Sequence, residues 1–261
     1  MKIRSVVLIL LCFASCKNHT RDVRGSSVLS LKSDTLLTEN RLEEARGVIA
    51  ESIELDSNNY AAYNNRAILN WKLKKSSREV LADFRKALSI YPSFEPSLFS
   101  RTNYYFDNKD YESAIESANN YFERATGEDF KPDLVQYIFE QRGAAKYMLR
   151  RYKNAVRDFK LAIGLDSTRK RSHLILGNCY FYQDSISLAI KQFDIAIQLD
   201  SGYTNAYMAR ARSYESIKTD PQLNLAEEDY KRAFLLDSKI EDIYETNSPL
   251  FKRIKERFNN K

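Results

Sequence analysis

The chain has 261 residues, which is enough for one or two compact domains or for one elongated array of repeats. Its seven glycines and five prolines are few, and charged residues make up 29% of it, so glycine-rich phosphate loops, many-turned β architectures and multiple membrane spans are all disfavoured. The formal net charge of +6 is modest, and no nucleic-acid recognition module accompanies the basic residues, so nucleic acid is not an expected partner.

The first fifteen residues, MKIRSVVLILLCFAS, have the features of a secretory signal peptide. Lys2 and Arg4 precede an apolar run from Val6 to Ala14. That run is about half the length of roughly twenty residues that a membrane-spanning helix needs. We therefore predict a signal peptide over residues 1–15.

The end of this run, Ala14-Ser15-Cys16, resembles the lipobox of bacterial lipoproteins. In that family the signal is cut before the cysteine, which is then acylated, so the resemblance implies a lipidated Cys16. The alternative is an ordinary secretory signal with an incidental cysteine. By the sorting rule known for bacterial lipoproteins, the absence of an aspartate directly after Cys16 makes the resemblance imply an outer-membrane location facing the periplasm, with the cell surface as the alternative.

Residues 16–35 are polar and weakly patterned, which predicts a lipidated flexible tether. Nineteen or so flexible residues would have a root-mean-square reach of roughly 25 Å. Once Cys12 is removed with the signal and Cys16 is acylated, Cys179 is the remaining thiol, and it cannot form an internal disulfide. Its apolar surroundings predict a small buried side chain.

One helical sequence motif recurs through the rest of the chain, as DFRKALSIYPS, DFKLAIGLDS, QFDIAIQLDS and DYKRAFLLDS. A degenerate copy, AESIELDS, comes first, and a divergent copy, NKDYESAIESANNYFERAT, lies where two neighbouring copies are twice the usual distance apart. The copies end near residues 57, 92, 126, 167, 201 and 238, so the intervals are 35, 34, 41, 34 and 37 residues. The longer intervals carry their extra residues in predicted loops.

A second helical segment precedes five of these phrases, with apolar or small residues at i, i+3, i+4 and i+7. This alternation of two short helices, with wording such as KDYESAI and RRYKNAVRDF, resembles the tetratricopeptide repeat (TPR) family. The resemblance covers about residues 36–238. It implies an all-α, right-handed superhelical solenoid of antiparallel helix pairs, with five full repeats after a degenerate first unit, in an array over residues 36–247.

Arginine in the first helix and aspartate in the second recur at matching positions of three repeats. We interpret them as structural ion pairs that lock the two helices together, not as catalytic acids. Losing one member of a largely buried pair should cost about 1–3 kcal/mol, because the other is left unsatisfied. The predicted pairs are Arg66 with Asp83, Arg142 with Asp158, and Arg210 with Asp229.

Residues 248–261 predict a final helix that begins at Ser248 and Pro249 and has one apolar side. A solenoid needs an end unit with a polar outer face to cover its last apolar surface, so we expect a capping helix. The alternative is a helix that lies on a membrane surface.

In the TPR family the first helices line a concave groove that binds peptide segments or helices of partners. Aromatic rings among amides suit an extended peptide, because the rings bury apolar side chains while the amides pair with its backbone. For any single ring the alternative is packing between repeats. The expected groove residues are Asn64, Trp71, Phe99, Asn103, Phe106, Tyr137, Glu140, Tyr147, Arg171, Leu174, Asn178, Phe181, Tyr182, Asn205, Met208 and Arg212. The basic run Arg169–Arg171 is interpreted as a solvated helix end or, alternatively, as a site for an anionic partner.

The sequence contains no HExxH, CxxC, GxSxG or P-loop pattern, and neither histidine lies in a cluster with metal-ligand spacing. We therefore expect no catalytic residue, no metal, no cofactor and no enzymatic activity. The expected function is a membrane-tethered TPR scaffold that binds a protein or peptide partner in its groove. The alternative is an accessory lipoprotein whose groove binds a glycan or a small molecule.

Overall fold

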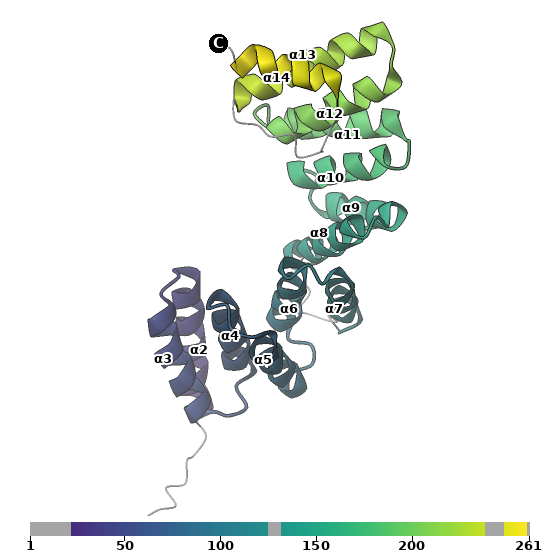
Figure 1. Ribbon diagram of the computed structural model, residues 1–261. Coiled ribbons are helices and arrows are strands. Elements are labelled where there is room, and N and C mark those ends of the chain that lie inside the picture. Colours follow the sequence, from purple (N-terminus) through teal and green to yellow (C-terminus); the bar gives the residue numbers. More distant parts are fainter. Residues whose placement is uncertain (1–21, 125–131, 238–247, 260–261) are drawn as a thin grey trace, which may run out of the picture. The chain divides into compact units, whose positions relative to one another are not determined.

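The computed structural model describes residues 22–124, 132–237 and 248–259. These residues form thirteen α-helices and no strands. Twelve of the helices form six consecutive pairs, each joined by a short turn, and the thirteenth follows the last pair (Figure 1). The chain divides into two units, residues 1–101 and 102–261, at a boundary inside the third pair.

The helix bounds repeat with the period of the sequence. The first helices of the pairs are α2 (Val23–Thr38), α4 (Tyr60–Lys72), α6 (Glu95–Asp107), α8 (Pro132–Met148), α10 (Lys170–Phe181) and α12 (Thr204–Ile217). The second helices are α3 (Leu42–Leu55), α5 (Ser77–Ile90), α7 (Tyr111–Arg124), α9 (Tyr152–Leu165), α11 (Ile186–Leu199) and α13 (Asp220–Leu236). Each second helix ends two residues before the unit end expected from the sequence.

A single left-handed residue joins the two helices of every pair. These residues have φ between 53° and 62° and stand 34, 35, 41, 34 and 34 residues apart. None of them is glycine, although a positive φ strains any side chain with a Cβ atom. They are Asn40, Lys74, Lys109, Arg150, Asp184 and Lys218.

The core of the array comes from three buried positions in each second helix, spaced at i, i+4 and i+7. In α9, α11 and α13 these positions hold an alanine, an aromatic residue and another alanine. The small residues on either side of the ring let neighbouring helices approach closely, and each buried ring contributes about 1.5–3 kcal/mol.

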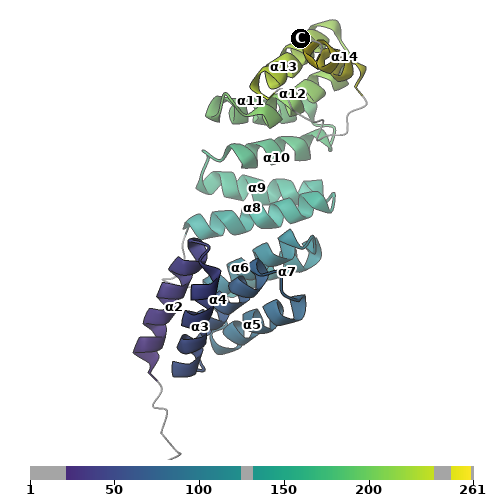
Figure 2. The same ribbon diagram turned by 60° about the vertical axis from the view of Figure 1, so that its left-hand side comes forward.

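In the second unit the pairs stack in chain order. Helix α9 packs between α8 and α10, and α11 packs between α10 and α12 (Figure 2). Helix α10 also contacts both α8 and α12, so the first helices of three repeats lie side by side on one face. This face is called the α8–α12 face below.

Residues 23–38 form helix α2, so the prediction of a flexible tether over residues 16–35 is wrong from residue 23 onward. The buried face of α2 carries Ser26, Ser30 and Ser33 in place of large apolar residues, and apolar periodicity therefore does not reveal it. Residues 1–21, which include Cys16 and the predicted signal peptide, lie outside the described residues.

The buried hydroxyls of α2 are satisfied by partners from elsewhere in the first unit. The Oγ atoms of Ser26 and Ser52 lie 3.1 Å apart, and Asn59 Nδ2 donates to Ser30 Oγ at 2.9 Å. Asn65 Nδ2 donates to Ser33 Oγ at 2.8 Å. Without such partners each buried polar group would cost about 1–3 kcal/mol, so these bonds allow a polar layer to replace an apolar one.

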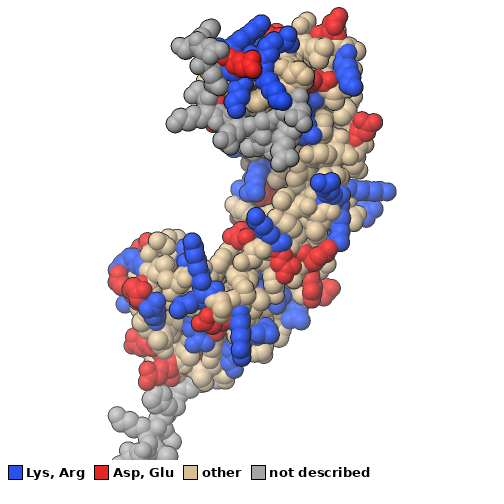
Figure 3. Space-filling model, viewed as in Figure 1, with Lys and Arg blue, Asp and Glu red and all other residues tan. Residues whose placement is uncertain are grey.

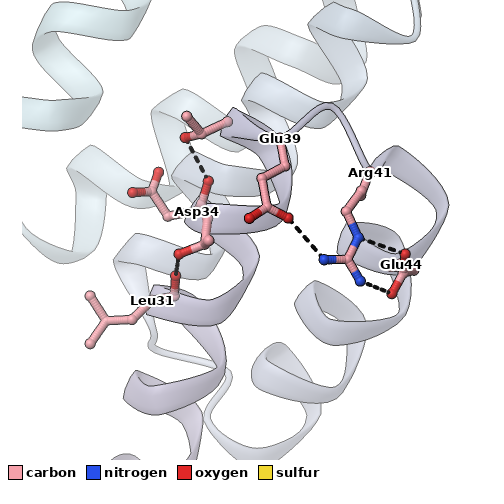
Figure 4. A network of polar contacts seen from close by, with 7 residues as sticks. Leu31, Asp34, Glu39, Arg41 and Glu44 are labelled. Carbon is pink, nitrogen blue, oxygen red and sulfur yellow. Dashed lines mark hydrogen bonds and ion pairs between the residues drawn. The ribbon is translucent and has the colours of Figure 1, made fainter.

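The turn between α2 and α3 is held by Arg41 (Figure 4). Its guanidinium donates to Glu39 at 2.8 Å and to both carboxylate oxygens of Glu44 at 2.8 and 2.7 Å. Arg41 holds the pKa of the Glu44 carboxyl below its ordinary value. Because all three side chains are about half exposed, solvent screens the network, and its main effect is to orient the turn.

Helix α14 (Pro249–Asn259) closes the second unit. Ser248 Oγ accepts the backbone N–H of Phe251 at 2.9 Å, and Leu250, Phe251 and Ile254 are buried against α13. The alternative of a membrane-surface helix would need this apolar side exposed. The outer side is polar instead, and Figure 3 shows Lys and Arg side chains gathered over α14. The expected array residues between 238 and 247 lie outside the described ranges.

Candidate partner-binding surface

Three arginine–aspartate pairs join the two helices of their repeats, with the same forked geometry. The guanidinium donates to both carboxylate oxygens at 2.9 and 2.6 Å for Arg66 with Asp83, at 3.1 and 2.7 Å for Arg142 with Asp158, and at 2.8 and 2.7 Å for Arg210 with Asp229. All three aspartates are buried. The pairs therefore fix the first helices, which carry the candidate surface, against the second helices.

In the first unit, the expected groove residues divide between the surface and the core. Trp71 and Phe99 are partly buried. Asn64 is fully buried: its Oδ1 accepts the Ser97 hydroxyl at 3.0 Å, and its Nδ2 donates to Asn65 at 3.3 Å. The expectation that Asn64 contacts a partner is wrong, because its amide is used inside the protein.

Three expected groove residues of the second unit are also buried, so their assignment to the groove is wrong. Leu174 belongs to the apolar core that α10 shares with α11 and α12. Met208 lies in the core beneath α13 and α14, and Asn178 is buried within α10. Leu174 is buried by α11 and α12 and Met208 by α13 and α14, so the packing of neighbouring helices decides which side of a first helix stays accessible.

Three others are partly buried and contribute little open surface. Phe106 packs against the apolar core around Phe159, as the alternative of packing between repeats expects. Asn205 is partly buried in α12. The Oδ1 atom of Asn103 is buried and has no hydrogen-bond partner among the described residues.

The C-terminal ends of α8 and α10 carry an aromatic cluster, defined here as Tyr147, Tyr152, Phe181, Tyr182 and Arg212. The Tyr182 ring stacks on that of Tyr152, with centroids 4.8 Å apart and 12° between the planes, and its centroid lies 6.2 Å from that of Tyr147. Arg212 reaches over from α12, with its guanidinium carbon 4.5 Å from the Phe181 ring centroid. Since Tyr182 remains 41% exposed, the cluster presents an aromatic platform to solvent.

The middle of α8 and the N-terminal half of α10 enclose a pocket of about 410 Å³, called the basic pocket here. Its residues come from α8, from the start of α10 and from the floor provided by α9. They are Tyr137, Glu140, Gln141, Ala144, Phe159, Thr168, Arg169, Lys170, Arg171, Ser172 and Ile175.

The basic side chains of this pocket differ in their partners. Arg169 lies 3.4 Å from Glu140, and Lys170 forms an ion pair with Asp200 at 2.5 Å. Arg171 is exposed, and it makes no hydrogen bond or ion pair with any residue in the described ranges. It is therefore the pocket cation that an acidic group of a ligand can approach without displacing a partner.

Glu140 is held inside the protein. Its carboxylate accepts the Ser172 hydroxyl and lies 3.4 Å from both Gln136 Nε2 and Arg169 Nη2. These contacts tie α8 to the start of α10. The carboxylate thus shapes the pocket and is not an open acidic group.

The basic pocket and the aromatic cluster lie on one continuous face. Along α8 the residues Tyr137, Glu140, Ala144 and Tyr147 follow spacings of three and four, so they share one side of the helix. Ten residues separate Tyr137 from Tyr147, which corresponds to about 15 Å along a helix axis. The α8–α12 face therefore has a cationic end and an aromatic end about 15 Å apart.

Several residues of this surface are absent from the sequence-based expectation, among them Arg169, Lys170 and Tyr152. Arg169 and Lys170 belong to the basic run that the sequence shows plainly, but which is interpreted first as a solvated helix end. Tyr152 is the first residue of a second helix, and its stacking on Tyr182 joins two repeats. A strict first-helix criterion for the groove misses it.

Within the described ranges, no helix combines the length and the apolar character needed to cross a membrane. In the same parts of the chain, no three His, Cys, Asp or Glu side chains come together as a metal site.

No family model matches the chain. DnaJ homolog subfamily C member 3 of Gallus gallus is 25% identical over 226 residues, which cover 80% of this chain and 44% of that protein. DnaJ homolog subfamily C member 7 of Mus musculus is 32% identical over 98 residues, covering 38% of this chain and 18% of that protein. The chain thus spans less than half the length of the curated relatives it matches.

Solved TPR proteins share the fold at low sequence identity. YrrB, described as a TPR protein with an unusual peptide-binding site, has a TM-score of 0.62 at 19% identity, covering 80% of this chain and 97% of its own. PilF of Pseudomonas aeruginosa has a TM-score of 0.70 at 13% identity, covering 89% and 97%. PilW, a type IV pilus biogenesis factor, has a TM-score of 0.67 at 12% identity, covering 88% and 98%. With its consecutive helix pairs, the chain is an all-α TPR solenoid.

Proposed function

We propose that this chain is a membrane-tethered TPR scaffold that binds an extended, acidic segment of a partner protein on the α8–α12 face. The observation that carries the proposal is the combination of an unpartnered Arg171 with the exposed aromatic platform around Tyr182. Aromatic residues and arginine dominate the binding energy at protein interfaces. The role is binding without catalysis, and it needs no cofactor or metal.

The spacing of the two ends defines the bound segment. An extended peptide rises about 3.3 Å per residue, so a separation of about 15 Å corresponds to four or five residues. The partner segment would therefore place an acidic group at Arg171 and an apolar side chain four or five positions away, against Tyr182. The described peptide-binding site of YrrB, which has the same fold, supports a peptide as the type of ligand.

Lipidation of Cys16 would hold this scaffold at the bacterial envelope. Stable anchoring takes more than one acyl chain, as the bacterial lipoprotein modification that the Ala14-Ser15-Cys16 sequence resembles would supply. We propose the outer membrane facing the periplasm, with the cell surface as the alternative. Incorporation of a labelled fatty acid into the chain, and its loss in Cys16→Ala, tests this part.

Photo-crosslinking tests the binding part. A benzophenone amino acid replaces Tyr182, and a matched control places it at Leu161, an exposed residue of α9 outside the pocket and the cluster. We expect a protein adduct from position 182 and not from position 161. Arg171→Glu in the same background should weaken the adduct, and more so at low ionic strength, where charge interactions are least screened. Equal adducts at both positions, or an adduct that Arg171→Glu leaves unchanged, would contradict the proposal.

A second candidate function is the binding of a small molecule or glycan. The basic pocket, at about 410 Å³, lies within the range of roughly 300–1,000 Å³ typical of small-molecule sites. A glycan is disfavoured as the ligand, because glycan sites need open polar groups and the Glu140 carboxylate is already bound by three neighbours. Purified chain titrated with candidate ligands decides between the two: a small-molecule site depends on Tyr137 and Arg171 but not on Tyr182, whereas a peptide site depends on all three.

A further inference from the structure

The two ends of the helix array have different outer faces. At the C-terminal end, α14 exposes Lys252, Arg253 and Glu256, which is the polar outer face that a terminal helix needs in water. At the N-terminal end, α2 exposes Val28 at 61% and Leu31 at 72%. Leu31 is the most exposed of the large apolar side chains in the described residues. Nothing in the described part of the chain covers this side of α2.

The exposed residues of α2 form one stripe. Arg24, Val28, Leu31 and Thr35 follow spacings of four, three and four, so they lie along the side of the helix opposite its buried serines. The stripe thus has an apolar middle, Val28 and Leu31, with Arg24 in line with it, Lys32 on one flank and Asp34 on the other. Basic residues beside an apolar strip are typical of a helix that lies on a membrane surface.

The chain length between the predicted lipid and α2 limits where this stripe can lie. Residues 17–22 are the six that separate Cys16 from Val23. The path from Cys16 to Val23 is seven residue steps, which span at most about 25 Å even when fully extended. A lipid on Cys16 would therefore keep the first turn of α2 within about 25 Å of the headgroups, whereas the nineteen-residue tether expected from the sequence could extend to about 65 Å.

We propose that α2 docks on the lipid bilayer, with Val28 and Leu31 at the boundary between headgroups and acyl chains and Arg24 and Lys32 beside anionic headgroups. This inference rests on the proposed lipidation of Cys16. Docking covers the apolar stripe that the N-terminal end of the array leaves exposed. It also fixes the orientation of the first unit relative to the membrane, whereas a long flexible tether would leave that orientation free.

Thiol accessibility tests this docking on the full, acylated chain. Leu31→Cys is compared with a matched control, Ala50→Cys, an exposed position on α3. Background labelling is low because Cys179 is buried, and burial raises the pKa of its thiol to about 12. In vesicles of phosphatidylethanolamine and phosphatidylglycerol, we expect a membrane-impermeant maleimide to react on the order of tenfold more slowly with residue 31 than with residue 50.

The reference is the unanchored Cys12→Ser/Cys16→Ser chain without vesicles, in which both positions should react at similar rates. Equal rates on vesicles, with acylation of Cys16 verified by mass, would overturn the docking proposal while leaving the tethered scaffold intact. A chain that is not acylated at all would instead overturn the tether itself. Slow reaction of residue 31 that persists in the unanchored chain would show that another protein surface covers α2, and would also overturn docking on the bilayer.

Discussion

Replacing Asp158 with asparagine removes one negative charge from a site where two cations converge. The Asp158 side chain is 2% exposed, and its oxygens lie 2.7 Å from both Arg142 Nη2 and Lys146 Nζ. The two cations are themselves only 16% and 17% exposed. Asparagine keeps the shape of the side chain, so the change isolates the loss of charge and leaves two poorly hydrated cations facing a neutral amide.

The size of the effect follows from this burial. Removing one partner of a buried ion pair costs about 3–5 kcal/mol, and because some water still reaches both cations we expect the lower end, about 3 kcal/mol. Asp83→Asn is the matched change in the first unit. Its partner Arg66 is 41% exposed, so water replaces much of the lost interaction and we expect about 1 kcal/mol.

Hydrogen exchange followed by mass spectrometry is the suitable assay, because repeat arrays open in parts and a single global transition can hide a local loss. Asp158→Asn should accelerate exchange in peptides from α9, and Asp83→Asn should accelerate it in peptides from α5. The first acceleration should be about thirtyfold larger than the second, because the two expected losses of stability differ by about 2 kcal/mol. If both variants accelerate exchange equally, or if α9 is unaffected, burial of the cations is not what makes Asp158 important.

Two glycines should respond to alanine with opposite signs. In Gly177→Ala the new Cβ would lie 2.4 Å from the buried ring of Phe193, and overpacking should destabilise the chain by about 1–3 kcal/mol. In Gly164→Ala, where nothing lies within 4 Å, helix propensity should stabilise it by up to about 1 kcal/mol; thermal unfolding measures both, and shifts of the same sign would contradict the packing argument. The ion pair with Lys170 holds the pKa of Asp200 below its ordinary value, so its stabilising effect is present above the unfolded-state pKa and is lost as the pH falls through the folded-state pKa. Lys170→Ala should therefore have a lower free energy of unfolding than the wild type at neutral pH, and that free energy should fall less as the pH is lowered. The same pH dependence in both proteins would refute this.

The repeat architecture could be predicted from the sequence because its core is locally encoded. The alanine–aromatic–alanine positions of α9, α11 and α13 recur at fixed spacing, and each is buried by its neighbours along the chain. The arginine–aspartate spacing carries the same information. The fold follows from these patterns because each repeat needs only its neighbours to bury its apolar side.

Helix α2 could not be predicted in this way, because its stability depends on polar contacts from outside itself. Ser26 and Ser30 suit a buried helix face only when Ser52 and Asn59, more than twenty residues away, satisfy their hydroxyls. A stripe of serines in a polar segment is typical of a linker when read alone. The information that makes it a helix lies in α3 and in the start of α4.

The candidate surface was predictable in its helices but not in its individual residues. The sequence assigned the groove to the first helices of all five full repeats, and of the residues it named, Arg171 in α10 and Tyr182 directly after α10 lie open. Helical spacing cannot say how closely the next helix packs, however, and that distance decides which residues stay accessible. Leu174 is therefore buried by α12, although it lies only three residues from Arg171.

Both proposed surfaces are places where an accessible side chain lacks the partner that its neighbours have. Lys170 and Arg169 are balanced by Asp200 and Glu140, and against that background Arg171 stands out as the pocket cation without an acidic partner among the described residues. In the same way, the polar outer side of α14 shows what an end helix of this array needs, and the exposed Leu31 of α2 departs from it. The repeats thus act as internal controls for one another. A position that breaks the pattern of its equivalents without a structural reason is the place at which an external partner is expected to bind.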